Sequence, residues 1–226
     1  MAAQQYVWYV SYGSNLRRER FLKYILGGTA PGGKRSNSGC VDRTPPLRDY
    51  ALDVPGDLYF SARSAIYDGG VAFIDHTVRH KTVKTRAYLI KLEQFWEITR
   101  QENGWLSMPE GLPSVEAIQQ QGQITLAYTG ASTRGHSSKY SLLVHLGYHD
   151  GYPLLTFTCP ERYKEANAPS RTYVQTLAIG LQESHKMTAD EIANYLADKW
   201  GVHGMYKPHE IAKIVRPVLQ SLPLNG

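Results

Sequence analysis

The sequence contains little cysteine and no long apolar run. Its 226 residues include two cysteines, Cys40 and Cys159, which are too few for a disulfide framework and lack a Cys-x-x-Cys spacing. No segment approaches the roughly 18 consecutive apolar residues of a membrane-spanning helix, and the N-terminus lacks the basic and apolar regions of a secretory leader. These absences argue against a disulfide-stabilised secreted module and against an integral membrane protein. We expect a cytoplasmic protein with reduced thiols and no membrane partner.

Phenylalanine is also scarce, with five residues against 16 tyrosines. Most of the aromatic surface therefore carries a hydroxyl group that needs a hydrogen-bond partner when it is buried. With 42% hydrophobic and 20% charged residues, the composition is that of an ordinary globular chain, which excludes intrinsic disorder. A chain of this length has enough residues to bury a core, and the tyrosines are candidates for a hydrogen-bonding pocket.

Acidic residues are rare in the first 48 positions, which hold eight Lys or Arg against Glu19 and Asp42, a net charge of +6. Residues 49–226 hold 17 basic and 18 acidic residues, a net charge of −1. The basic side chains lie mainly on a predicted helix and in a glycine-rich loop, and they are Arg17, Arg18, Arg20, Lys23, Lys34 and Arg35. A phosphate or nucleic-acid patch would fit this pattern, but a solvated helix face is the commoner origin of such a run. We therefore predict no nucleic-acid partner.

Hydrophobic periodicity predicts an α+β fold. Strands are expected at 6–12, 58–60, 70–74, 85–91, 124–129, 141–148 and 153–158, the last two joined by a turn at Asp150-Gly151. Helices are expected from an N-cap at Asn15 to Gly27, over 92–104, 114–121, 173–181 and 188–200, and from 208, with 27–57 as loop. Strand and helix patterns compete over 173–181, and a cap at Ser170 favours the helix. The order predicts a curled, mostly antiparallel or mixed sheet with surrounding helices, in one domain over 1–226 with a C-terminal helical extension from about 188.

Two familiar ligand motifs are incomplete. Residues 28–35 nearly fit a phosphate-binding loop, but Arg35 stands where the magnesium-binding hydroxyl is needed. His145 and His149 have the spacing of a helical metal pair, yet the nearby glycines and proline favour a hairpin, where two ordinary sheet histidines are the commoner interpretation. We therefore expect neither a cofactor nor a metal.

The segment Tyr12-Gly13-Ser14-Asn15-Leu16 lies at a predicted junction from strand to helix. A glycine there lets backbone N–H groups approach a ligand, and the helix that follows offers free N–H donors and the positive end of its dipole. Such a loop can bind a carboxylate or act as an oxyanion hole. A capped turn that binds no ligand would have the same sequence.

Glu102 is placed at the end of the predicted helix over 92–104, beside the apolar face that contains Phe95 and Thr99. Burial and the negative end of the helix dipole both disfavour a charged carboxylate, which is how a glutamate becomes a general acid or base near neutral pH. The alternative is a last-turn glutamate that faces solvent or pairs with Arg100.

Together, the Tyr12–Leu16 segment and Gln101-Glu102-Asn103-Gly104 resemble the γ-glutamylcyclotransferase-like family. Further stretches are similar, namely Leu58–Phe60 with Ser64 and Gly69–Ala72, Tyr88–Leu92, and Pro169-Ser170 with Tyr173. The resemblance implies a compact barrel-like sheet with surrounding helices and one pocket. It also implies cyclisation of a γ-glutamyl group to 5-oxoproline without metal or cofactor. Glu102 would be the general acid and base, and the residues implied to bind the small-molecule substrate are Tyr12, Gly13, Ser14, Asn15, Leu16 and Tyr173.

The sequence departs from the family pattern at a few positions. Asn103 replaces a glycine, Tyr67-Asp68 replaces a Trp-Gly pair, and Phe157 stands where some relatives have a pocket tyrosine. The insertion-like stretch 105–123 is expected to border the mouth of the pocket. These changes concern the choice of substrate, so the leaving amine stays open. A non-catalytic module that uses the same pocket to bind a γ-glutamyl or carboxylate ligand is the alternative function.

Overall fold

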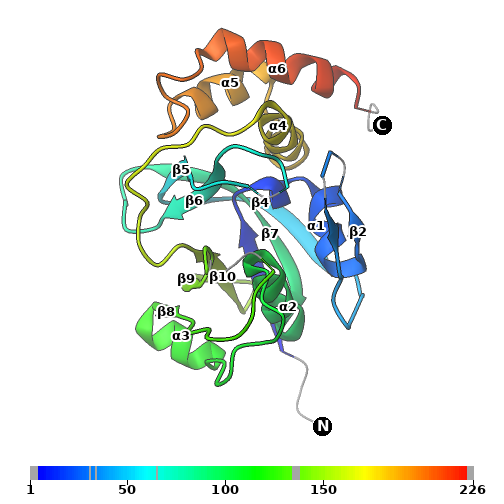
Figure 1. Cartoon of the computed structure of the whole chain (residues 1–226), viewed down its shortest axis with the longest axis vertical. Coiled ribbons are helices and arrows are strands. Elements are labelled where there is room, and N and C mark those ends of the chain that lie inside the picture. Colours follow the sequence, from blue (N-terminus) through cyan, green and yellow to red (C-terminus); the bar gives the residue numbers. More distant parts are fainter. Residues whose placement is uncertain (1–4, 31, 34, 65, 134–137, 223–226) are drawn as a thin grey trace.

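A six-stranded sheet forms the centre of the computed structural model, which describes residues 5–30, 32–33, 35–64, 66–133 and 138–222 (Figure 1). The strands are β1 (Tyr6–Ser11), β2 (Gly28–Thr29), β3 (Ser36–Asn37), β4 (Arg48–Pro55), β5 (Asp57–Ser61), β6 (Val71–Asp75), β7 (Thr82–Lys91), β8 (Gln123–Thr125), β9 (Leu142–His149) and β10 (Tyr152–Thr158). The helices are η1 (Ser14–Leu16), α1 (Arg18–Leu26), α2 (Leu92–Asn103), α3 (Val115–Gln121), α4 (Arg171–His185), α5 (Ala189–Ala197) and α6 (Pro208–Gln220). None of the described helices has the length and apolar character that spanning a bilayer requires.

The strand order in the main sheet is β4-β7-β1-β10-β9-β8. β1 pairs in parallel with β10 and antiparallel with β7, and the remaining pairs are antiparallel, so the mixed, mostly antiparallel sheet is confirmed. The barrel-like closure is wrong, because within the described residues β4 and β8 remain the two edges of an open sheet. β8 pairs with β9 over three residues, and β5 and β6 form a separate two-stranded sheet that does not bridge the edges.

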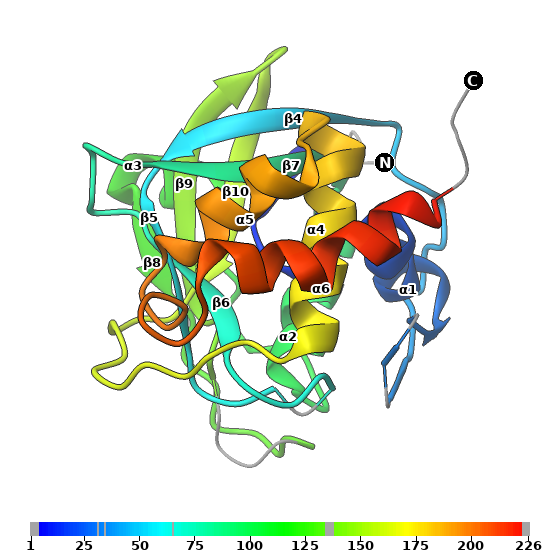
Figure 2. The ribbon, with the colours of Figure 1, turned by 90° about the horizontal axis from the view of Figure 1, so that it is seen from above.

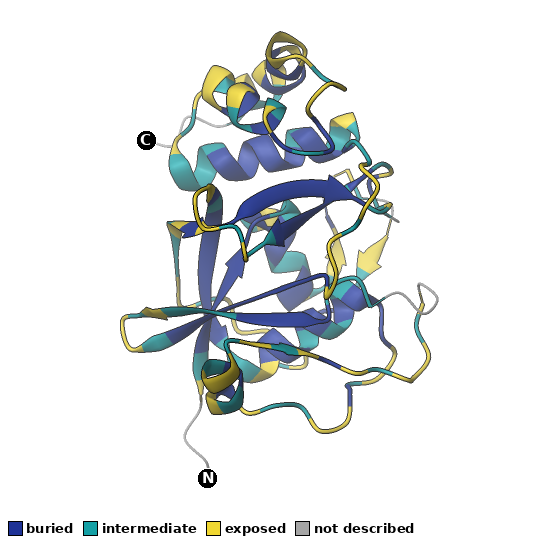
Figure 3. Cartoon of the chain, turned by 90° about the vertical axis from the view of Figure 1, so that its left-hand side faces the viewer, coloured by how far each residue is buried: buried dark blue, intermediate teal, exposed yellow. Residues whose placement is uncertain are grey.

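Helices cover both faces of the sheet. Successive side chains along β1 point to opposite faces and therefore belong to two different hydrophobic cores. Trp8, Val10 and Tyr12 join the core under α4, α5 and α6, whereas Val7 and Tyr9 join the core with α1, α2 and α3. In Figure 2, α4, α5 and α6 lie together over one face of the sheet, and α5 contacts it directly, because the Tyr195 hydroxyl accepts a hydrogen bond of 3.0 Å from Lys84 N of β7. Figure 3 shows that the central strands and α4 are largely buried while the outer surfaces of α5 and α6 are exposed.

Most of the helix caps and turns predicted from the sequence are present in the structure. Ser114 and Ser170 accept hydrogen bonds from the backbone of the first turns of α3 and α4, so both caps are confirmed. Thr188 and Glu191 form the expected capping box of α5, and Asp150-Gly151 is the turn between β9 and β10. These signals succeed because each depends on neighbours within a few positions of the chain.

Three predictions of local structure are wrong. Residues 48–55, expected as loop, form the edge strand β4, whose Tyr50, Leu52 and Val54 alternate toward the core. α5 ends at Ala197, before the predicted end at 200. Asn15 does not cap α1, because the N-cap is Arg17 and the side chain of Asn15 is used elsewhere. Lys34, expected in a basic loop, lies outside the described residues.

Candidate functional site

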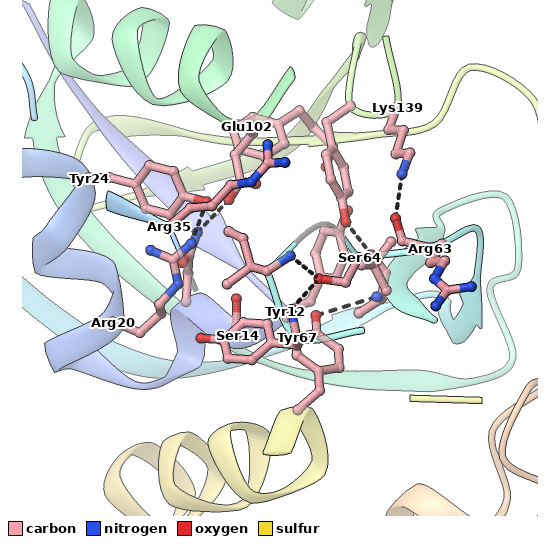
Figure 4. A pocket seen from close by; sticks show the side chains of 18 of the residues that line it. Tyr12, Ser14, Arg20, Tyr24, Arg35, Arg63, Ser64, Tyr67, Glu102 and Lys139 are labelled. Atoms are coloured by element: carbon pink, nitrogen blue, oxygen red, sulfur yellow. Dashed lines mark hydrogen bonds between the residues drawn. The ribbon is translucent and has the colours of Figure 1, made fainter. Parts of the chain in front are cut away.

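A cavity of about 220 Å³ lies where the loop after β1, the C-terminal end of α2 and the first turn of α4 meet (Figure 4). Its charged lining groups are one carboxylate and several cations, namely Glu102, Arg20, Arg35, Arg63 and Lys139. Its aromatic lining is made of Phe157 and six tyrosines, namely Tyr9, Tyr12, Tyr24, Tyr67, Tyr140 and Tyr173. The tyrosine-rich pocket expected from the composition is thus present.

Tyr12, Gly13, Ser14 and Asn15 form the wall of this cavity nearest to β1, whereas Leu16, also predicted to bind the substrate, is buried in the core and does not line it. β1 ends at Ser11, and residues 14–16 make a single 3-10 turn in which the N–H of Leu16 donates to the carbonyl of Gly13 over 3.0 Å. A Cβ atom on Gly13 would lie 3.0 Å from the Tyr173 hydroxyl oxygen, so glycine permits that hydroxyl to reach the loop.

The loop is held from its far side by buried groups. The Tyr88 hydroxyl donates to the carbonyl of Asn15 over 2.8 Å, and Arg86 Nη1 donates to the carbonyl of Leu16 over 3.2 Å. Gly180 of α4 packs against the same backbone, since a Cβ there would lie 2.5 Å from the carbonyl carbon of Leu16. These contacts fix the backbone of the loop from behind, and the Asn15 side chain extends from it to the cavity.

Glu102 lies half-buried in the last turn of α2, which ends at Gly104 in the left-handed conformation. Asn15 Nδ2 donates to Glu102 Oε1 over 3.0 Å and lies 3.1 Å from the Tyr9 hydroxyl. Arg100, the alternative partner, donates to the carbonyl of Trp105 instead. The two motifs, 87 positions apart in the chain, thus meet through one amide group.

The tyrosine hydroxyls around Glu102 keep their protons. Burial, and then the charge of Glu102, raise the pKa of Tyr9 well above its ordinary value. Burial also raises the pKa of Tyr173, whose hydroxyl lies 3.4 Å from the backbone N of Ala72 and interacts with the backbone of Ser14. Because this oxygen accepts from backbone N–H groups, its proton is available to an acceptor in the cavity.

The departures from the family pattern lie around this cavity. Asn103 is buried, and its side chain exchanges hydrogen bonds with the backbone N and O of Tyr140, so it fixes a lining tyrosine. Tyr67 packs against Tyr173 with 5.2 Å between ring centroids, and Phe157 stacks on Tyr9 at the same distance. The stretch 105–123, expected to border the mouth, supplies none of the described lining residues. Trp105 and Leu106 line a neighbouring hollow with Arg35, Ile66 and Thr133, which also line the cavity.

Arg20 is a lining residue for which the sequence-based prediction was wrong. It was expected on a solvated helix face, but it is 1% exposed and lies beside Tyr24. Phe21, Tyr24 and Ile25 are the buried face of α1, and Arg20 is four positions before Tyr24, on the same face. That spacing is the signal that could have located it, although hydrophobic periodicity gives arginine no weight.

The arrangement can do acid–base chemistry on an anionic or polar ligand. The Glu102 carboxylate of α2 lies beside the Asn15 amide of the loop, and buried tyrosine hydroxyls and a buried guanidinium surround both. In the described part of the chain, His, Cys, Asp and Glu form no cluster of three or more that could hold a metal.

Comparison with known proteins identifies a relative with a similar sequence. No family model matches the chain. It is 33% identical over 212 residues to a protein of Arabidopsis thaliana named Histone deacetylase 5, a match that covers 84% of this chain. The chain spans 30% of the length of that relative, whose name describes the longer protein.

Comparison with solved structures shows the fold. A gamma-glutamyl cyclotransferase has a TM-score of 0.50 at 15% identity, with 94% of this chain and 99% of the other covered. The crystal structure of an uncharacterized protein from Homo sapiens has a TM-score of 0.49, also at 15% identity and with the same coverage. The chain therefore has the gamma-glutamyl cyclotransferase-like fold.

Proposed function

We propose that the protein is a γ-glutamylcyclotransferase, which converts the γ-glutamyl group of a small amide into 5-oxoproline and releases the amine. The observation that supports this most is the hydrogen bond of 3.0 Å from Asn15 to Glu102, which brings the loop and the acid to one cavity. The fold agrees with the proposal, although it does not by itself specify a reaction.

In the proposed reaction, Glu102 takes a proton from the α-ammonium group of the γ-glutamyl moiety. The α-nitrogen then attacks the γ-carbonyl carbon, forming the new C–N bond and moving an electron pair onto the carbonyl oxygen. When that pair returns, the original amide C–N bond breaks, and the proton on Glu102 passes to the leaving nitrogen. The new ring nitrogen still carries one proton more than the lactam needs, so Glu102 takes this second proton and passes it to the released amine, which leaves as an ammonium ion. Atoms and charge balance without water or a cofactor, and one carboxyl group carries both proton transfers.

The loop and the tyrosines would supply the other contributions. The Tyr173 hydroxyl, whose oxygen accepts from backbone N–H groups, would donate its proton to the developing oxyanion, and a donor fixed before the reaction needs no reorganisation. A folded γ-glutamyl group held against this wall gains the proximity that makes cyclisation fast.

The charge around the cavity favours an anionic leaving amine. Arg35 and Arg63 are exposed lining residues, and Lys139 Nζ donates to the carbonyl of Arg63 over 2.7 Å, so cations gather on the more exposed part of the lining. We propose a γ-glutamyl amino acid or peptide with a free carboxylate as the substrate, in preference to a γ-glutamyl derivative of a cationic amine.

The test is a panel of γ-glutamyl amines that differ in the charge of the leaving group. Purified protein should release 5-oxoproline and free amine in equal amounts, fastest for the anionic members. No release from any member, together with calorimetric binding of 5-oxoproline, would favour the non-catalytic binding module. Fastest release from the cationic members would contradict the proposed substrate class alone.

A further inference from the structure

Arg20 is a buried cation in the wall of the cavity. Its Nη2 donates to the Tyr24 hydroxyl over 2.8 Å and its Nη1 to Asn37 Oδ1 over 3.1 Å. The guanidinium carbon lies 4.4 Å from the centroid of the Tyr24 ring, and Nε has no hydrogen-bond partner in the described structure. The partners of Arg20 are thus a neutral hydroxyl, an aromatic ring and an amide.

No ion pair of the described chain includes Arg20. The residue stays charged, because desolvation is outweighed by Tyr24, Tyr67 and Glu102, which together raise the pKa of Arg20. The guanidinium is stabilised when an anion enters the cavity and accepts from its remaining N–H donors.

We propose that Arg20 binds the α-carboxylate of the γ-glutamyl group. The inference rests on the proposed function, which brings a substrate with this carboxylate into the cavity. The α-carboxylate and the α-amine share one carbon atom, so an amine that reaches Glu102 carries the carboxylate to within a few ångströms of the same wall. Arg20 lies on that wall and is close enough to Glu102 for their charges to interact. Figure 4 shows both side chains at the same side of the cavity.

The other cations around the cavity are placed differently. Arg63 is exposed and pairs with Asp68 over 2.7 Å, and Arg35 is exposed on the loop beyond α1. Solvent screens these groups, so they suit the more variable leaving amine. Arg20 is buried away from solvent, so it suits the α-carboxylate, which every γ-glutamyl substrate shares.

The experiment compares substrates with and without the carboxylate. A 4-aminobutanoyl amide has the same amine and the same amide but no α-carboxylate, and the same attack converts it into 2-pyrrolidinone. The wild-type protein should prefer the γ-glutamyl amide. Arg20→Met should lower kcat/KM for the γ-glutamyl amide by about 10- to 100-fold, the loss expected for a charge-assisted hydrogen bond, and change that for the 4-aminobutanoyl amide by less than about threefold.

Arg48→Met is the matched control, because Arg48 pairs with Asp150 at the surface and does not line the cavity. It should keep the wild-type preference. If Arg20→Met does not fold, as judged by circular dichroism, Arg20→Lys keeps the charge with fewer donors and should lose part of the preference. A preference that is unchanged in a folded Arg20 variant would overturn the proposal.

A binding measurement separates this proposal from the proposed reaction. Calorimetry with 5-oxoproline and 2-pyrrolidinone involves no chemistry, and Arg20→Met should remove the advantage of 5-oxoproline. Wild-type protein without turnover, but with this Arg20-dependent preference, would contradict the reaction and keep the carboxylate site. Wild-type turnover together with an Arg20→Met preference equal to that of the wild type would contradict the carboxylate site and keep the reaction.

Discussion

Asn15 shows how one side chain joins two distant parts of the chain. The sequence favours it as a helix cap, because asparagine before an apolar helical pattern has that role in many proteins. In the structure its amide nitrogen lies between Glu102 and the Tyr9 hydroxyl, while its buried Oδ1 has no protein partner. A polar atom of this kind in a cavity wall is available to a ligand donor, such as an ammonium group.

Asn15→Asp would replace the amide donor with a second carboxylate beside Glu102. Two carboxyl groups at this distance do not both ionise readily, so one of them would hold a proton to higher pH. We expect kcat/KM to fall by about tenfold or more and the acidic limb of the pH–rate profile to move to higher pH. Asn194→Asp, on the exposed face of α5, is the control and should change neither. A pH profile that keeps its wild-type position would argue against direct contact between positions 15 and 102.

Individual site residues can be predicted from the sequence where a residue type is unusual for its position in the predicted element. Glu102 was found because it borders an apolar helix face, and the structure places it in the cavity lining. Arg20 was missed because a buried arginine and a solvated one have the same hydrophobic pattern. The position of Arg20 four residues before Tyr24 is a local signal of burial, and the contact with Asn37 appears only in the structure.

At the scale of elements, β7 supports the loop after β1. Arg86 and Tyr88 lie on this strand, and Arg86 is fixed in turn by Asp49 of β4 and Glu183 of α4. Arg86 Nε donates to Asp49 Oδ1 over 2.7 Å, and Nη1 donates to Glu183 Oε2 over 2.9 Å. The position of the loop therefore depends on strands and a helix that do not themselves contact the ligand.

Tyr88→Phe tests this support with little change in packing. The ring, which stacks on Phe21 with 3.9 Å between centroids, would stay, and the hydrogen bond to the carbonyl of Asn15 would be lost. We expect a loss of about 1 kcal/mol of stability, a several-fold lower kcat with little change in KM, and shifted amide resonances for Ser14 and Leu16.

Tyr50→Phe on the neighbouring strand is the matched control, since the Tyr50 hydroxyl has no hydrogen-bond partner in the described structure and its residue pairs with Ala87. It should leave kcat and the loop resonances unchanged. Equal effects of the two substitutions would mean that β7 does not position the loop.

Elements with a strong internal pattern were predictable, and those defined by their surroundings were not. β1 and β10 are mostly apolar runs buried on both faces, and their strands were expected, as was the stretch 85–91 of β7. β4 is an edge strand with mostly exposed or half-buried residues, so its alternation was hidden among polar neighbours. The open sheet could not be predicted because closure depends on whether β4 and β8 meet, which local sequence does not encode.

At the scale of the whole molecule, the buried tyrosines make the folded protein less stable at alkaline pH. Burial raises the pKa of several tyrosines above the ordinary value of 10.0, and these are Tyr9, Tyr12, Tyr88, Tyr140 and Tyr173. In the unfolded chain they lose their protons near pH 10, whereas in the folded chain they keep them. The unfolded state then binds fewer protons, so the free energy of unfolding is fully present below pH 10 and falls as the pH rises above it.

We expect this loss to approach about 1.4 kcal/mol per pH unit for each such tyrosine. Urea denaturation at pH 8, 9.5 and 10.5 would measure it, with phenolate absorbance as a second signal. Ionisation of these tyrosines should coincide with unfolding. Phenolate formation by most of the 16 tyrosines in the folded protein near pH 10 would contradict the burial of the pocket.

The net charge also has a different meaning at this scale. The +6 of the first 48 residues was expected to be solvated, yet two of its members, Arg20 and Arg35, line the cavity. Part of the basic excess is therefore placed where an anionic substrate would enter, and the composition alone could not locate it.

The most direct test of the account is the rate of 5-oxoproline release by Glu102→Gln. Glutamine keeps the size of the side chain and cannot carry the proton, so kcat should fall by about 10²- to 10⁴-fold while the protein stays folded and binds 5-oxoproline. Glu93→Gln, on an exposed position of the same helix, should retain the wild-type rate. A folded Glu102→Gln protein that turns over γ-glutamyl substrates as fast as the wild type would contradict the central claim.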